Sequence, residues 1–429
     1  MRLMMIRISY VFLLFLLFQF SKQNDNSEQF LKCFPNNKLS GDNPQKISAL
    51  MARSRLQFSI EFMKNVVKRS KSGENIFFSP HSVYQAMLLS LFVSNNETEN
   101  RIKMALQLPK NLDKLDVLQV FKMDNKFEKI RSASSVSYEL NNINKFFYEE
   151  DLSIRNCMKS LFTDELFALN FKQNPSEARQ FVNDFVSNQT KNQINNLLND
   201  NDVDEETKLI LVNAMYFKGL WHSKFNPENT KKDVFYISSS RSSLVPMMRQ
   251  KSNFKYLISE KLTAHIIQLP YKGEDISMYI LLPPFVDPNG VNLLLDKLNV
   301  EVLSELVEPN YMSDRPVELA IPKFVVEQEI RDLKSILNSM GVGDIFGNTA
   351  DLSALTGKEG IFLNDAVHKA KVSIDEEGTT AAAATAVFTF RSSRPSEPIK
   401  FICNHPFIYF LYDNVSRSIL FIGVYNSPE

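Results

Sequence analysis

The clearest alternation of apolar and polar positions lies near the C-terminal end of the chain, over the eight residues from 368 to 375. One face of an extended chain there would carry His368, Ala370, Val372 and Ile374. The other face would carry Lys369, Lys371, Ser373 and Asp375. A period of two predicts a β-strand that turns one face to the core.

An unusual tract follows that strand. After Glu376, Glu377 and Gly378 the chain carries no charge as far as Phe390. Glycine can act as a hinge because it reaches backbone conformations closed to other residues. The small residues that follow are Thr379, Ala381, Ala382, Ala383, Ala384 and Thr385. Such a tract could enter a sheet as a strand, because its alternate side chains are small and uncharged. An exposed helix is the alternative, since alanine is the best helix former.

The remaining pattern mixes helices and strands. Helical spacing of apolar residues predicts a helix from about Ala49 to Ser70 and another over Leu333 to Met340. Strand character appears at Val136 to Phe147, Met278 to Pro284 and Val317 to Phe324. No regular alternation of strand and helix occurs, which favours an α+β fold. No repeat or linker interrupts the sequence, so we expect one domain over residues 49–429.

The N-terminal end reads as a targeting segment. Arg2 and Arg7 precede an apolar run, Ile8 to Phe20, that gives way to polar residues at Ser21. This pattern predicts a signal peptide over residues 1–21, with a signal anchor as the alternative. The run is short for a transmembrane helix. Residues 22–48 are polar and are expected to form a loose extension. These features predict a secreted, extracellular protein.

Composition narrows the function classes. The chain has 429 residues, of which 44% are hydrophobic and 23% charged, so it can bury a substantial core. Basic and acidic residues both number 49, and this balance gives no support to binding of nucleic acid or a membrane surface. Cys33, Cys157 and Cys403 allow at most one disulfide.

Motifs for catalysis are missing from the sequence. It contains no G-x-S-x-G, H-E-x-x-H or C-x-x-C, and no glycine-rich nucleotide loop. The five histidines lack metal-ligand spacing. We therefore expect no enzyme activity, no metal and no cofactor. His368 is on the apolar face of its strand, where a hydrogen-bonded core histidine is the ordinary explanation.

Several stretches resemble one family. The run from Glu376 to Thr385 looks like the hinge of an inhibitory serpin. The segments Asn404 to Phe407 and Ser418 to Gly423 resemble the closing strands of that family, and Asn213 to Gly219 with Trp221 resembles an internal strand. These segments occur in the family's order over most of the chain. The sequence resembles secreted arthropod serpins in particular.

The resemblance implies a serpin fold, with large mixed β-sheets surrounded by helices and an exposed reactive-centre loop near the C-terminus. It also implies a role for His368, which with Asn213, Ser79 and Ser82 would hold the centre of the main sheet shut. Trp221 would lie at the top of that sheet, where the loop enters, although a lone tryptophan is usually core.

The implied activity is that of a suicide substrate. An extracellular serine protease, in an immune cascade for example, would form a covalent acyl complex with the cleaved loop, and the loop would insert into the main sheet of a monomer. A serpin-fold carrier or chaperone is the alternative. The scissile bond could follow Arg391, for a trypsin-like enzyme, or Ser392, before Ser393, for an elastase-like one. Phe388 or Phe390 would suit a chymotrypsin-like enzyme.

Two surface features complete the predictions. Asn96, Asn188 and Asn414 begin glycosylation sequons, which would be used if the chain is secreted. Glycosaminoglycan binding would need a basic helix face at the residues that carry Lys110, Lys114, Lys122 and Lys126. Interleaved aspartates favour a solvated helix face there instead, so this partner has only weak support.

Overall fold

The structure, a computed structural model, describes residues 30–35, 37–71, 73–285, 289–378 and 397–428. Its helices are α3 (Pro44–Arg69), α4 (Pro80–Val93), α5 (Asn96–Ala105), α6 (Lys114–Ser134), α7 (Asn156–Leu161), α8 (Pro175–Gln189), α9 (Gly290–Lys297), α10 (Val300–Leu306), α11 (Leu333–Ser339) and α12 (Ser353–Thr356). Its strands are β1 (Ile76–Phe78), β2 (Tyr138–Glu149), β3 (Leu166–Leu169), β4 (Leu209–Gly219), β5 (Lys231–Tyr236), β6 (Ser242–Ser259), β7 (Ala264–Pro270), β8 (Ile276–Leu282), β9 (Ser313–Pro322), β10 (Phe324–Ile330), β11 (Asp365–Ile374), β12 (Ile399–Ile402), β13 (Phe407–Asp413) and β14 (Ser418–Tyr425).

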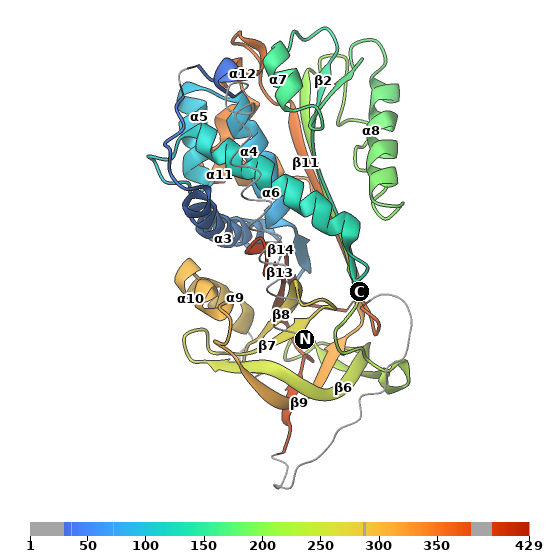
Figure 1. Ribbon diagram of the computed structural model, residues 1–429. Coiled ribbons are helices and arrows are strands. Elements are labelled where there is room, and N and C mark those ends of the chain that lie inside the picture. Colours follow the sequence, from blue (N-terminus) through green and yellow to red (C-terminus); the bar gives the residue numbers. More distant parts are fainter. Residues whose placement is uncertain (1–29, 36, 72, 286–288, 379–396, 429) are drawn as a thin grey trace.

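Five strands form the main sheet, in the order β10-β11-β4-β2-β3. The central strands β4 and β11 are parallel, whereas β2 and β10 run antiparallel to their neighbours β4 and β11. Helices α4 and α6 lie on one side of this sheet and α8 lies on the other (Figure 1). The sheet is therefore covered on both faces, which explains why nearly every residue of β4 is buried.

The second sheet has nine strands, in the order β1-β14-β13-β8-β7-β6-β9-β12, with β5 paired to β6. In Figure 1 its strands β6 and β9 lie at the opposite end of the molecule from α5 and α12. Apolar side chains of both sheets share one core cluster, in which Phe217 of β4 packs near Phe421 of β14. The expected α+β architecture, with mixed sheets and surrounding helices, is confirmed.

Helix α4 lies beneath the main sheet, and all of its residues are buried. A helix that is apolar around its whole circumference is stable only inside the core. Its start is fixed by Ser79, whose side chain accepts a hydrogen bond from the Ser82 N–H at 3.0 Å, and by Pro80 in the first turn. This cap places two serine side chains under the centre of the sheet.

Helix α3 begins at Pro44, five residues before the predicted start at Ala49. The Asn43 side chain caps it by accepting a hydrogen bond from the Gln45 N–H at 2.9 Å. Proline suits the first helical turn because it has no N–H to satisfy there. The sequence pattern missed this start because the first turn has few apolar residues.

The N-terminal segment preceding α3 is held against the helices. Cys33 forms a disulfide with Cys157, and Phe34 is buried. The Ser40 N–H donates to the Asp116 carboxylate at 3.1 Å. The expectation of a loose extension is thus wrong for residues 30–35 and 37–43, because these contacts fix the segment. Cys403 is the remaining cysteine, and it is buried.

The predicted signal peptide, residues 1–21, and the beginning of the polar extension lie outside the described residues. In the part of the chain that the structure describes, no helix combines the length and apolar character that crossing a membrane requires.

Candidate functional site

The parallel contact between β4 and β11 is the central feature of the main sheet, and we call it the seam. Eight residue pairs are in register along it, from Asp365 opposite Ile210 to Val372 opposite Phe217. A parallel ladder is slightly less stable per residue than an antiparallel one. A strand placed between β4 and β11 and running opposite to both would form two antiparallel ladders where one parallel ladder now stands.

A buried cluster of polar side chains crosses the seam at its middle. His368 of β11 is opposite Asn213 of β4, and the His368 Nδ1 is hydrogen-bonded to the Asn213 Oδ1. The Asn213 Nδ2 donates to the Ser82 Oγ at 2.6 Å. The Ser79 N–H donates to the His368 Nε2 at 3.0 Å. The structure thus brings together Ser79, Ser82, Asn213 and His368, four of the residues predicted to gate the sheet with Trp221, and that gating role stays a prediction.

The geometry fixes the charge state of His368. Because Nε2 accepts a hydrogen bond from the Ser79 N–H, the ring proton is on Nδ1 and is donated to Asn213. A second proton on Nε2 would face the Ser79 N–H donor. His368 is also fully buried, and this burial lowers its pKa from 6.5 to about 3. The ring is therefore neutral at physiological pH.

Acid is expected to weaken the seam through His368. The unfolded chain takes up a proton near pH 6.5, but the folded ring does not until about pH 3. The stability that depends on neutral His368 is complete above pH 6.5 and falls by about 1.4 kcal/mol per pH unit below it. Denaturant unfolding at pH 7.5 and pH 5 measures this. His368→Gln keeps one donor and one acceptor without titrating, so its loss of stability between the two pH values is expected to be smaller. An equal loss in both proteins would contradict the assignment.

A second cluster lies at the end of the seam, beyond the last residues of β4 and β11. The Trp221 N–H donates to the Glu377 carbonyl at 3.1 Å, and the Trp221 indole Nε1 donates to the Asp375 carbonyl at 2.9 Å. The Glu376 carboxylate accepts hydrogen bonds from the Lys323 Nζ at 2.6 Å and the Thr230 Oγ1 at 2.8 Å. Burial opposes ionisation of Glu376, but these bonds leave its pKa below the usual value. The chain is thus fastened where it leaves β11.

Gly378 closes this cluster. Its φ angle is +71°, in the left-handed region that favours glycine. A Cβ atom at this position would overlap the backbone of Gly219 and Trp221. No other residue fits here without moving the end of β4. Gly378 therefore lies at the mouth of the seam, against the end of β4.

Sequence reasoning missed several members of both clusters. Asn142 and Asn144 of β2 extend the central network, since the Ser82 Oγ donates to the Asn142 Oδ1 at 2.9 Å and the Asn144 Oδ1 accepts from Asn213. The sequence could have indicated them, because two asparagines occupy alternate positions of β2 on a face that would otherwise be apolar. Tyr271 stacks on Trp221 with 4.3 Å between ring centroids, and only the tertiary structure reveals that contact.

The two clusters do not include every residue that the sequence analysis singled out. The rest of the predicted hinge and the scissile-bond candidates are outside the described residues: Thr379, Ala381, Ala382, Ala383, Ala384, Thr385, Arg391, Ser392 and Ser393. The sequon residues Asn96, Asn188 and Asn414 are all exposed.

The four lysines considered for glycosaminoglycan do not form one exposed face: Lys110 and Lys126 are exposed, Lys122 is half-buried and Lys114 is buried. Lys114 is fully buried, where its Nζ binds the Glu99 carboxylate at 2.6 Å and lies over the Phe34 ring. Lys122 is paired with Glu165 at 3.3 Å. The solvated face expected here is therefore wrong for Lys114, because the N-terminal segment covers it. Among the described residues no cluster of three or more His, Cys, Asp or Glu could hold a metal ion.

Comparison with known proteins finds relatives that all belong to one family. Serine protease inhibitor 88Ea of Drosophila melanogaster is 39% identical over 383 residues, which are 86% of this chain and 88% of that protein. Serpin B3 of Homo sapiens is 37% identical over 374 residues, 84% of this chain and 95% of that protein. The crystal structure of uncleaved ovalbumin matches with a TM-score of 0.77 at 26% identity, over 88% of this chain and all of that one.

The predicted localisation needs correction. Serpin B3 and Serpin B4 of Homo sapiens, at 37% and 36% identity, belong to the clade B serpins, which are intracellular. These relatives contradict the expectation of a secreted, extracellular protein. The apolar N-terminal run misled the prediction because it was interpreted without relatives. Glycosylation at the three sequons depended on secretion and loses its basis.

The family itself follows from the length and consistency of the match. A family model described as Serpin (serine protease inhibitor) matches residues 53–428, which include both sheets, the seam and the two clusters. The family is one of serine protease inhibitors and not of enzymes. The matched span and the relatives above together show that this chain belongs to the serpin family.

Proposed function

We propose that the chain inhibits a serine protease as a suicide substrate, by insertion of its cleaved loop into the seam between β4 and β11. One observation carries the proposal: Asp375, Glu376 and Glu377, directly before Gly378, are fastened at the mouth of the seam by hydrogen bonds from Trp221 and Lys323. The tract that follows in the sequence is uncharged from Thr379 to Phe390. A strand that turns back at Gly378 would run antiparallel to both β4 and β11.

The chemistry begins as ordinary proteolysis. The protease serine Oγ attacks the carbonyl carbon of the scissile bond, an ester forms, and the new amine leaves with the C-terminal part of the inhibitor. Water would normally hydrolyse the ester. Insertion of the loop carries the attached protease away before that step and distorts its oxyanion hole, which stabilises the charge that hydrolysis needs.

Length and energy agree with this scheme. The uncharged tract has twelve residues, Thr379 to Phe390, and extends about 40 Å at ~3.3 Å per residue. Strand β4 has eleven residues, so the two are nearly equal in length. About a dozen new ladder hydrogen bonds at ~1 kcal/mol each would release on the order of 10 kcal/mol. That amount is enough to deform a partner's active site.

The composition of the hinge favours an inhibitor over a serpin-fold carrier or chaperone. Neighbours of this fold such as ovalbumin include non-inhibitory proteins, so fold alone does not decide. Insertion requires small, uncharged side chains at the inward positions. Thr379, Ala381, Ala383 and Thr385 meet that requirement.

We further infer a trypsin-like target that cleaves after Arg391. A basic residue suits the acidic specificity pocket of such enzymes. Arg394 is a poor alternative because Pro395 follows it. Cleavage after Ser392 by an elastase-like enzyme, or after Phe388 or Phe390 by a chymotrypsin-like one, gives fragments of different mass.

A panel of serine proteases tests the proposal. The purified chain is incubated with trypsin, elastase and chymotrypsin, and denaturant-resistant adducts are sought by gel electrophoresis. We expect an adduct with trypsin, and a released fragment that begins at Ser392 by mass spectrometry. Clean cleavage by all three enzymes without any adduct would contradict inhibition. An adduct with elastase alone would contradict the trypsin-like target and leave the inhibitory mechanism standing.

A further inference from the structure

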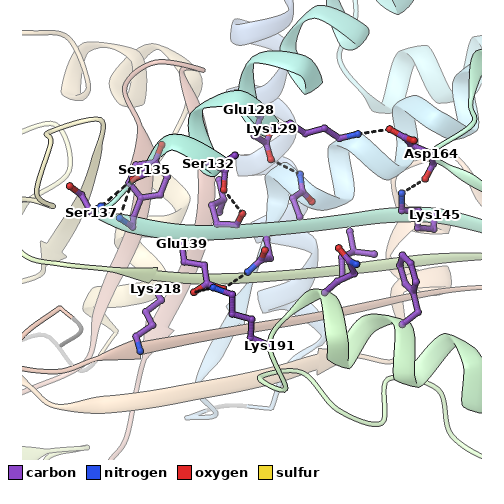
Figure 2. Close-up of a pocket in the computed structure, with 18 of the residues that line it drawn as sticks. Glu128, Lys129, Ser132, Ser135, Ser137, Glu139, Lys145, Asp164, Lys191 and Lys218 are labelled. Atoms are coloured by element: carbon purple, nitrogen blue, oxygen red, sulfur yellow. Dashed lines mark hydrogen bonds and ion pairs between the residues drawn. The ribbon is translucent and has the colours of Figure 1, made fainter.

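A groove of about 930 Å³ lies beside the main sheet, away from the seam. It is bordered by the C-terminal half of α6, by β2 and by the C-terminal end of α8 (Figure 2). Figure 2 shows Glu128, Lys129 and Ser132 of α6 on one side of β2, and Lys191 and Lys218 on the other. The first half of β2 therefore lies within the groove.

Strand β2 is an open sheet edge along this half. It pairs with β4 from Tyr138 to Tyr148, but its other neighbour, β3, covers only Phe146–Glu149. In an antiparallel pair, alternate residues turn their backbone N–H and C=O away from the partner strand. The Phe146 N–H donates outward to the Glu165 carbonyl at 2.8 Å, so even-numbered residues of β2 face outward.

Two of these outward residues have unpaired backbone groups. The Leu140 carbonyl accepts a hydrogen bond from the Ser132 Oγ at 2.9 Å. Within the described ranges, no hydrogen bond reaches the outward backbone N–H and C=O of Asn142 and Asn144. Unpaired edge groups are a template for another strand. The Tyr138 hydroxyl also lines the groove and has no hydrogen bond to described residues, although its side chain is only 8% exposed.

Charge in the groove is unevenly compensated. Its three carboxylates are all engaged: Asp164 with Lys129 at 2.6 Å, Glu139 with Lys191 at 3.0 Å, and Glu128 with His81 at 3.3 Å. Its remaining two charges are Lys145 and Lys218. The Lys145 Nζ donates to the Asp164 backbone carbonyl, and neither lysine forms an ion pair with a carboxylate among the residues that the structure places. The surplus is therefore positive.

We propose that this groove binds an extended acidic segment of a partner protein, which adds as a strand to the open edge of β2. The backbone of the segment would pair with the outward groups of Asn142 and Asn144, and its carboxylates would lie near Lys145 and Lys218. Main-chain pairing supplies affinity in this mode of recognition and side-chain contacts supply specificity. The site is separate from the seam, so it does not depend on the proposed inhibitory function.

Hydrogen exchange with two matched peptides tests the site. The probe is a blocked eight-residue peptide that alternates glutamate and valine, and the control alternates lysine and valine. We expect the glutamate peptide to slow exchange of the Asn142 and Asn144 amides, which face the groove, and the lysine peptide to leave them unchanged. Equal protection of these amides by both peptides overturns the proposal. Binding of the glutamate peptide without protection of these amides also overturns it, because that is the behaviour of a simple anion on a charged patch.

Paired substitutions separate charge from fold. Lys145→Gln combined with Lys218→Gln is expected to raise the dissociation constant of the glutamate peptide about tenfold. Lys68→Gln combined with Lys358→Gln removes the same charge from exposed positions outside the groove and is expected to leave the constant unchanged. Equal weakening by both pairs would mean that only net charge matters, and it would overturn the site.

Discussion

Thr379→Arg is expected to convert this chain from an inhibitor into a substrate. Position 379 directly follows the hinge glycine and, with Ala381 and Ala383, faces inward when the tract forms a strand. Insertion would bury an unpaired guanidinium, which costs several kcal/mol. If about 2 kcal/mol of that cost falls on the insertion barrier, insertion slows roughly 30-fold and the protease hydrolyses the ester first. The measurement is the fraction of protein found as covalent adduct against the fraction cleaved.

Thr380→Arg is the matched control. Its side chain faces the opposite side of an inserted strand because side chains alternate. It introduces the same charge one residue away, and we expect it to retain most of the adduct. Full adduct formation by Thr379→Arg would contradict insertion of the hinge, and loss of adduct in both variants would point to impaired binding of the protease.

A disulfide across the seam is expected to abolish inhibition reversibly. Val212 of β4 and Val367 of β11 are paired in register and buried. Neighbouring strands about 4.8 Å apart are within reach of a disulfide. An inserted strand would move them about 9.6 Å apart, beyond that reach. We expect the oxidised double variant Val212→Cys, Val367→Cys to be cleaved without forming an adduct.

Reduction of the same variant supplies its own control, since it restores separable strands without changing the sequence. Adduct formation is expected to return on reduction. Wild-type protein treated with the same reductant controls for loss of the Cys33–Cys157 disulfide. An oxidised variant that forms as much adduct as its reduced form would show that the seam need not open.

The sequence predicted the local features of the site better than the contacts that its residues make with distant parts of the chain. The alternation from 368 to 375 located β11, and a histidine on its apolar face indicated a buried polar contact. Glu376 and Gly378 were identified by their resemblance to the hinge of an inhibitory serpin. Their roles as ion-pair partner of Lys323 and as close neighbour of the β4 end depend on segments far away in the sequence. Such contacts have no local signal.

Charge and exposure were hardest to predict. Interleaved aspartates indicated a solvated helix at Lys114, yet that lysine is fully buried between the Phe34 ring, the Ser94 carbonyl and the Glu99 carboxylate. Three cysteines could not reveal which pair would meet, because pairing depends on where the N-terminal segment docks. The open edge of β2 was equally hidden, since strand length does not tell how much of each edge is paired.

Thermal unfolding of intact and cleaved protein tests loop insertion most directly. Trypsin cleaves the loop, adduct is removed, and the two forms are compared by calorimetry. Insertion that releases on the order of 10 kcal/mol is expected to raise the melting temperature by roughly 10 °C, because the entropy of unfolding of a chain of 429 residues is about 0.9 kcal/mol/K. A cleaved form that melts at or below the temperature of the intact protein would contradict insertion into the seam.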